Sequence, residues 1–115
     1  MRIKIRKADS LYSQYLRKKI PYCERCGLTE TLQVSHFWGR RNESTRFDPQ
    51  NTDILCFSCH RHFTENPADY REWKLKKLGE REYKILDVRA HSYQKRDDNQ
   101  IILWIMSQDK QIDRG

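Results

Sequence analysis

Apolar residues near the start of the chain recur on one face of a helix. We predict this helix over residues 8–19, with Asp9 or Ser10 as its cap and Ile20-Pro21 as its end. Its apolar face consists of Leu11, Tyr12, Tyr15 and Leu16. The spacing therefore predicts one amphipathic helix before the first cysteine.

Two short segments further along are candidates for strands. Residues 31–37 alternate loosely between apolar and polar residues, and we expect a second short strand over residues 51–55. Residues 39–50 between them are polar, basic and irregular. A loop of this length in a small domain is usually functional.

The second half of the chain has helical signals. We expect a short helix over 60–65, and a second over 67–78 with Pro67 at its first position and Gly79 after its end. A third helix is predicted over 80–92.

A last helix, capped by Asp97 and Asp98, contains six consecutive apolar residues at 101–106. Such a run cannot face one core only. Either the helices at 67–78 and 80–92 cover both of its sides, or its outer side meets a second subunit in a homodimer.

Composition limits the size of the core. The chain has 115 residues, of which 37% are hydrophobic, and its mean hydropathy is −1.02. A single small core of this kind gains much from a structural metal. The longest apolar run, 101–106, is too short to cross a membrane, and the basic N-terminus lacks a following apolar segment. We therefore expect a cytoplasmic protein.

The net charge of +7 is concentrated near the candidate site. Residues 1–26 are rich in lysine and arginine, and Arg40, Arg41 and Arg46 lie in the loop described above. This placement favours a polyanionic partner, most simply DNA, although small basic domains also carry charge for solubility.

Four cysteines form the pattern C-x2-C-x29-C-x2-C: Cys23, Cys26, Cys56 and Cys59. Two thiolate pairs on turns predict a tetrahedral structural zinc. The alternative is four unrelated buried cysteines. Cys56-x-x-Cys59-His60 also matches the attachment pattern of c-type haem, but that chemistry needs export and leaves Cys23 and Cys26 unexplained. A thioredoxin-like role would need a βαβ setting, which is absent from the pattern.

His36 follows the first predicted strand, Asn51 lies 15 residues later, and His60 directly follows the second cysteine pair. With the paired cysteines, this arrangement resembles the HNH endonucleases and their ββα-metal fold, over roughly residues 20–70. Within that superfamily the chain looks most like phage recombination nucleases of the NinG type.

The resemblance implies a role for each of the three residues. His36 would be the general base, because its unperturbed pKa lies near neutrality. Asn51 would hold the loop and orient His36, or lie close to the metal. His60 would bind Mg²⁺ or Mn²⁺, which stabilises charge on the scissile phosphate.

The chain departs from the family pattern at two positions. Ser35 precedes the base where relatives often have Asp or His as a metal ligand, and Thr64 stands where many have a second histidine. His62 cannot replace that histidine, because two residues along a helix are a rotation of about 200°; we expect it to reach DNA phosphate or solvent. These departures leave open a DNA-binding module without catalysis.

Three aromatic residues, Phe37, Trp38 and Phe47, flank the basic loop. They can stack on exposed bases, but aromatics beside a zinc turn more often form the core, and we favour that interpretation.

We therefore expect one α+β domain over 1–115. Its zinc-braced ββα-metal core would span 20–70, with a basic segment and helix at 1–19 and a helical extension at 71–115. The expected function is metal-dependent cleavage of DNA in phage or prophage recombination, and His91 is expected to be an ordinary surface residue.

Overall fold

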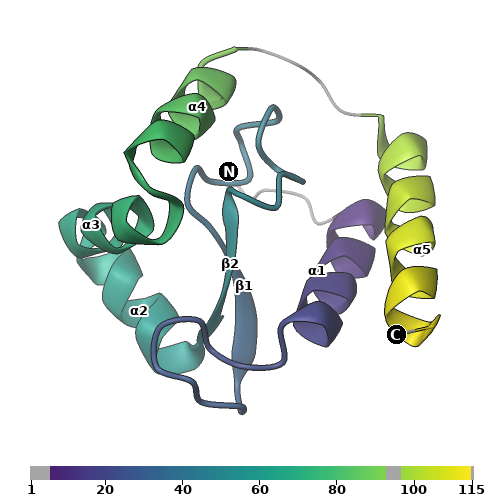
Figure 1. The fold of residues 1–115 in the computed structure, drawn as a ribbon, viewed down its shortest axis with the longest axis horizontal. Coiled ribbons are helices and arrows are strands. Elements are labelled where there is room, and N and C mark those ends of the chain that lie inside the picture. The colour runs from purple at the N-terminus through teal and green to yellow at the C-terminus, as the bar shows by residue number, and fades with distance from the viewer. Residues whose placement is uncertain (1–5, 93–96, 115) are drawn as a thin grey trace.

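The computed structural model describes residues 6–92 and 97–114, which form five helices and a two-stranded sheet (Figure 1). In chain order the elements are α1 (Lys7–Lys19), β1 (Leu32–His36), β2 (Thr52–Cys56), α2 (Phe57–Glu65), α3 (Pro67–Leu78), α4 (Glu80–Ala90) and α5 (Asp98–Arg114). The predicted α+β class is confirmed. The basic residues Arg2 and Lys4 lie outside the described residues. Among those described, no helix is long and apolar enough to cross a lipid bilayer.

The sheet is an antiparallel pair with helices on both faces. Leu32 of β1 pairs with Cys56, and His36 pairs with Thr52. All five residues of β2 are buried, because α1 and α5 lie on one side of the sheet and α2 and α3 on the other (Figure 1). Neighbouring residues of β2 therefore enter different cores: Ile54 packs toward α1, and Leu55 packs toward the cysteines.

Two apolar clusters result from this arrangement. The first joins α1, α5 and the sheet, and contains Ala8, Tyr12, Tyr15, Leu16, Phe47, Ile54 and Ile105. The second joins the cysteines to α2 and α3, and contains Cys23, Leu55, Cys56, Cys59, Phe63 and Tyr70. The interpretation of Phe47 as a core residue is confirmed, since its ring packs edge-on against Tyr12 with the ring centroids 5.7 Å apart.

Helix ends mostly follow the sequence signals. Pro67 begins α3, and Gly79 separates α3 from α4 with a φ of +83° that favours glycine. The Asp97 carboxylate accepts a hydrogen bond from the backbone N–H of Asn99 (2.9 Å). The helix expected from His60 begins earlier, at Phe57.

The free edge of β2 is covered by the first cysteine turn. The backbone N–H of Glu24 donates to the Ile54 carbonyl (2.8 Å), and the Ile54 N–H donates to the Glu24 carboxylate (2.7 Å). One residue thus satisfies both backbone groups of Ile54 on the side of β2 that faces away from β1.

The helix α5 packs against α1, whereas α3 and α4 lie across the sheet from it (Figure 1). The expectation that the helices at 67–78 and 80–92 cover both sides of this helix is therefore wrong. Ile105 is buried at 2% exposure, but Leu103 and Met106 are 66% and 53% exposed. Part of the apolar run faces away from the core.

Candidate metal centre and histidine site

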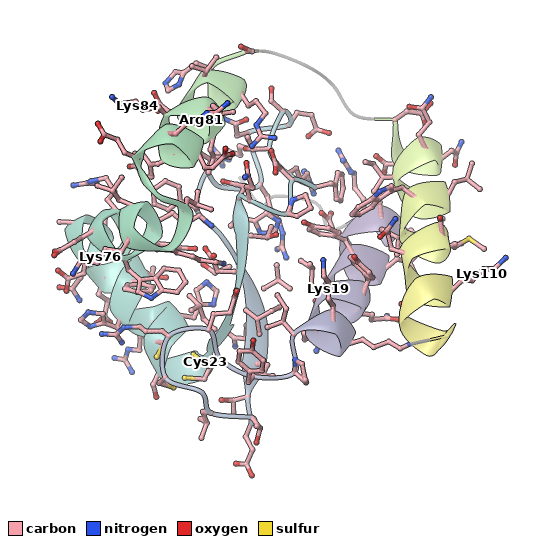
Figure 2. All side chains as sticks on the ribbon, in the orientation of Figure 1. Lys19, Cys23, Lys76, Arg81, Lys84 and Lys110 are labelled. Atoms are coloured by element: carbon pink, nitrogen blue, oxygen red, sulfur yellow. The ribbon has the colours of Figure 1, made fainter. Side chains whose placement is uncertain are left out.

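The four cysteine sulfurs come together beside α2, as the sulfur atoms around Cys23 show in Figure 2. All four lie within 4.8 Å of one another, and Sγ of Cys26 is 3.7 Å from Sγ of Cys56. Zinc–sulfur bonds of about 2.3 Å place tetrahedral sulfurs about 3.8 Å apart. The donor set therefore fits a tetrahedral zinc ion.

Backbone geometry explains why each cysteine pair points its sulfurs inward. Gly27 has a φ of +82°, and its N–H donates to the Cys23 carbonyl (2.8 Å), closing the first turn. In the second pair, Cys56 ends β2 and caps α2, and its sulfur accepts from the Cys59 N–H (3.5 Å). The second pair is thus held by a strand end and a helix start.

A bound cation is needed to hold all four sulfurs as thiolates. Burial opposes ionisation of Cys23, but backbone N–H groups, those of Cys56 and Cys26 first, outweigh it and lower the pKa of this thiol to about 6. Burial raises the pKa of the Cys59 thiol to about 12. Four thiolates cannot share so small a volume without a bound positive charge.

His36 ends β1 and is partly buried. Its Nε2 donates a hydrogen bond to the Arg46 carbonyl (3.0 Å), so the proton of the neutral ring is on Nε2. Burial, followed by the charge of Arg40, lowers the pKa of His36 to about 4. At neutral pH the ring is therefore uncharged, and Nδ1 has a lone pair for which the described residues provide no hydrogen-bond partner.

Asn51 holds the loop between the strands. Its side chain is fully buried, accepts from the Trp38 N–H (2.8 Å), and donates to the carbonyls of Trp38 (2.9 Å) and Thr45 (3.0 Å). The Asn51 carbonyl also accepts from the Phe37 N–H (2.8 Å). These bonds fix the backbone just after His36 and leave the amide buried. Of its two expected roles, the loop-holding one fits these contacts and the metal-proximal one does not.

His60 lies in the first turn of α2, where Gln33 of β1 orients it. Nδ1 of His60 donates to Oε1 of Gln33 (2.6 Å), which leaves Nε2 as the nitrogen able to bind a metal. Burial and the charge of Arg40 lower the pKa of His60, so a neutral ring is favoured. A hydrogen-bond acceptor that holds the other ring nitrogen is typical of metal-binding histidines.

The neighbouring positions add no further metal ligand. Ser35 is buried, and its hydroxyl is 2.9 Å from the Tyr70 hydroxyl. The Thr64 hydroxyl donates to the His60 carbonyl (2.9 Å). His62 is partly exposed and pairs with Asp69 (2.9 Å). Within the described residues, the cysteine cluster is the one group of three or more His, Cys, Asp or Glu placed to hold a metal.

The three loop arginines differ in position. Arg41 is exposed and Arg40 is partly exposed. The Arg46 side chain is only 6% exposed, and its guanidinium binds the buried Asp9 carboxylate through two hydrogen bonds (2.9 and 2.6 Å). The expectation that Arg46 contacts DNA phosphate is therefore corrected, because this buried ion pair ties the loop to α1.

Two hollows border the histidines. The first is a cavity of about 500 Å³ to which both His36 and His60 contribute. Its aromatic walls are Phe37, Trp38, Phe63, Tyr70 and Tyr83. The second, of about 520 Å³, also contains both histidines and is bordered by Arg17, Gln33 and Arg40. The structure thus brings His36 and His60 to one site, and adds Arg17, Gln33 and Tyr83. The sequence had indicated Arg17 only through general basic charge and Gln33 only through its place in a strand, and it gave no signal for Tyr83.

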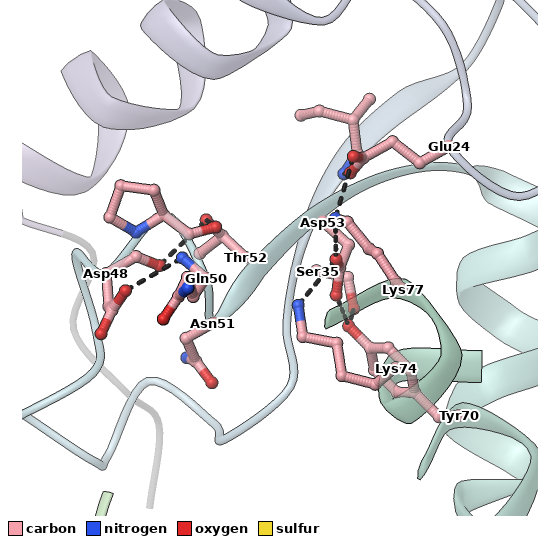
Figure 3. A network of polar contacts seen from close by, with 12 residues as sticks. Glu24, Ser35, Asp48, Gln50, Asn51, Thr52, Asp53, Tyr70, Lys74 and Lys77 are labelled. Carbon is pink, nitrogen blue, oxygen red and sulfur yellow. Dashed lines mark hydrogen bonds and ion pairs between the residues drawn. The ribbon is translucent and has the colours of Figure 1, made fainter. Parts of the chain in front are cut away.

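A buried polar network joins β1 and β2 to α3 (Figure 3). The Asp53 carboxylate accepts from Lys74 (2.8 Å), Lys77 (2.6 Å) and the Tyr70 hydroxyl (2.7 Å), and Tyr70 also contacts Ser35. Lys74 is fully buried, and burial lowers its pKa. The sequence does not indicate this network, because a lysine on a polar helix resembles a surface residue.

Comparisons of this chain with protein-family models, with curated proteins and with solved structures found no match.

Proposed function

We propose that the protein is a metal-dependent DNA endonuclease in which His36 activates the attacking water. The observation that carries this proposal is the hydrogen bond from Nε2 of His36 to the Arg46 carbonyl. This bond leaves Nδ1 as the nitrogen that can accept a proton, and Nδ1 has no hydrogen-bond partner among the described residues. A neutral, oriented imidazole beside a hollow with basic residues has the chemistry of a general base for phosphodiester hydrolysis.

His60 is the residue that would hold the catalytic cation, Mg²⁺ or Mn²⁺. Its Nε2 is available because Nδ1 is bonded to Gln33. When bound, such a cation withdraws charge from the phosphate and the leaving oxygen. Since the described residues offer one imidazole and no clustered carboxylate, water and phosphate oxygens would complete the shell, as Mg²⁺ tolerates.

The order of elements supports a zinc-braced ββα-metal core of the HNH kind. β1, β2 and α2 follow one another, with His36 at the end of β1 and His60 in α2. The cysteine cluster fixes the junction of β2 and α2, just ahead of His60. A role in phage or prophage recombination rests on the sequence resemblance alone.

Supercoiled plasmid tests the proposal. Wild-type protein with Mg²⁺ or Mn²⁺ should convert it to open-circular and linear forms, and EDTA should prevent this. His36→Ala and His60→Ala should each lower the rate at saturating DNA by at least 100-fold, since general-base catalysis contributes about 10²–10⁴. His62→Ala is the matched control on α2 and should keep that rate.

A second candidate is a zinc-braced DNA-binding module without catalysis. The observation that favours it is that neither Ser35 nor Thr64 is available as a ligand, because each hydroxyl is engaged within the protein. The same experiment separates the two functions. Retained plasmid binding with no nicking in either metal would support the module, and wild-type nicking by His36→Ala would remove this residue from the mechanism.

A further inference from the structure

The cavity beside the two histidines has unusually aromatic walls for a site that handles a phosphodiester. Phe37 and Trp38 come from the segment after β1, Phe63 from α2, Tyr70 from α3 and Tyr83 from α4. At about 500 Å³, it is within the range of pockets that bind small planar molecules, about 300–1,000 Å³. Four separate segments therefore build one apolar cavity next to His36.

The Phe37 ring meets two other wall rings edge to face, while Phe63 and Tyr70 are stacked in parallel. The Phe37 ring centroid is 5.0 Å from that of Tyr70 and 5.8 Å from that of Tyr83. Tyr70 and Phe63 are buried in the second core, whereas Phe37, Trp38 and Tyr83 are only partly buried. The last three are thus the wall residues that keep accessible surface for contact with a ligand.

The cavity also contains polar groups suited to a heterocycle. Arg71 and Asp87 line it, and their side chains donate and accept hydrogen bonds respectively. The edge of a base offers partners of both kinds, whereas a purely hydrocarbon ligand offers none.

The second hollow, which has the same two histidines in its wall, has a different character. Arg17 and Arg40 border it together with Ser13 and Gln33, so it suits phosphate rather than a base. A basic hollow and an aromatic cavity therefore meet at His36 and His60. A nucleic-acid strand also places a charged group next to a planar one, because each phosphate is followed by a sugar and a planar base.

We propose that the aromatic cavity binds one unpaired nucleobase of a DNA strand whose cleaved phosphodiester lies at His36 and His60. The inference rests on the proposed nuclease function and deepens it by naming the substrate class. A base in a duplex is paired and stacked on both faces, so it cannot enter a walled cavity without leaving the helix, which costs a few kcal/mol. The preferred substrate is therefore DNA with unpaired nucleotides at the cleaved bond.

Three DNA substrates of one sequence test this inference: a single strand, a full duplex, and a duplex with a short unpaired stretch. Each carries 2-aminopurine at the susceptible nucleotide, because stacking on aromatic rings quenches its fluorescence. Cleavage in Mn²⁺ should be at least 10-fold faster for the two substrates with unpaired nucleotides, and binding in Ca²⁺ should quench the probe in those two only.

Substitution of Tyr83 identifies the cavity as the binding site. Tyr83→Ala should weaken single-strand binding by about 10-fold or more, in line with the loss of one base–aromatic stack, and Tyr83→Phe should restore it. Tyr22→Ala is the matched control, because Tyr22 is 50% exposed and lines neither hollow. Zinc content and melting temperature are measured for each variant, so that a folding defect is recognised.

The failures of the two proposals are distinguishable. Equal cleavage of duplex and single strand, with no quenching and no effect of Tyr83→Ala, would overturn the base cavity and leave the nuclease standing. No cleavage of any of the three DNAs would overturn the nuclease. If binding still quenched the probe in the single strand, and Tyr83→Ala abolished this quenching, the result would support the cavity as a base-binding site even without cleavage.

Discussion

At His36, one hydrogen bond decides which ring nitrogen can accept a proton. The Arg46 carbonyl fixes the proton on Nε2, and the Arg46 side chain is in turn fixed by Asp9 of α1. The orientation of the proposed base thus depends on the ion pair between Arg46 and Asp9, two residues that border neither hollow. Loss of Arg46 can therefore lower activity through stability and position, without removing any contact to substrate.

The lowered pKa of His36 predicts the acid limb of the pH profile. The base acts in its neutral form, so activity is retained above its folded-state pKa and lost as the pH falls through about 4. We expect kcat/KM to be constant from pH 7 to about 5 and to halve near pH 4, rather than near 6.5 as for an unperturbed histidine. Arg40→Gln removes the positive charge that, after burial, lowers the pKa of His36. The acid limb of this variant should therefore lie at higher pH. A wild-type limb near pH 6.5 would contradict the prediction.

The exchange of Arg46 tests whether its role is structural. Arg46→Met leaves the buried Asp9 carboxylate unpaired, which should lower the free energy of unfolding by about 3–5 kcal/mol. Arg41→Met, on the exposed part of the same loop, should change it by no more than about 0.5 kcal/mol. Urea unfolding measures both.

For DNA binding we expect the opposite order of effects. Arg41→Met should weaken binding and reduce its salt dependence, so that the slope of log affinity against log salt concentration falls by about 0.9. Equal stability of the two variants would overturn the assignment.

At the scale of elements, the second cysteine pair joins a strand to a helix. Cys56 belongs to β2 and caps α2, and Cys59 lies in the first turn of that helix. The first pair, on its own turn, is connected to β2 through Glu24. A zinc ion at the four sulfurs would thus fix the register between β2 and α2, and with it the position of His60.

Zinc removal should therefore unfold much of the domain rather than one turn. We expect one zinc per chain, and Cys26→Ser should lose it together with the cooperative thermal transition, because structural zinc contributes about 10–16 kcal/mol in small domains. Ser58→Ala is the matched control, since Ser58 lies between Cys56 and Cys59 but is exposed. Elemental analysis and circular dichroism provide the two measurements. Protein purified without chelator that contained no zinc would contradict the prediction.

Most elements were predictable because their signals are local. Pro67 and Gly79 mark the ends of α3, and the equal spacing within the two cysteine pairs is enough to indicate a shared site. The burial of Arg46 and Lys74 was not predictable, since it depends on carboxylates 37 and 21 residues away. Loops have no periodicity that separates buried from exposed arginines. The base-sized cavity was missed for the same reason, because its walls come from segments between residues 35 and 87.

Across the whole molecule, the first and last helices lie side by side, with α5 packed on α1 (Figure 1). Tyr15 contacts Trp104 edge-on, with ring centroids 5.7 Å apart, and Lys18 pairs with Asp109 (3.8 Å). The buried face of α5 is thus well matched to α1. Its outer face exposes Leu103 and Met106, which have no place in either core.

Self-association through this outer face stays a prediction that can be tested directly. Sedimentation equilibrium at micromolar concentration should give twice the chain mass of 14.1 kDa, and Leu103→Lys with Met106→Lys should return it to the monomer. Val88→Lys is the matched control, because Val88 of α4 is equally exposed at 65% and lies outside the patch. Ile105 is unsuitable for this test, as it is buried in the first core. A wild-type monomer would refute the dimer.

The contact between Glu24 and the free edge of β2 has a consequence for the protein before it acquires metal. The same turn that carries Cys23 and Cys26 shields a strand whose sequence, Ile54-Leu55, is apolar. Without the ion to hold that turn, the strand would present unpaired N–H and C=O groups to any other strand it met. Metal-free chains are therefore expected to form intermolecular β-structure instead of remaining dispersed and unfolded. Expression in zinc-poor medium should then yield inclusion bodies, and the timing of zinc capture during synthesis would decide how much usable protein a cell obtains.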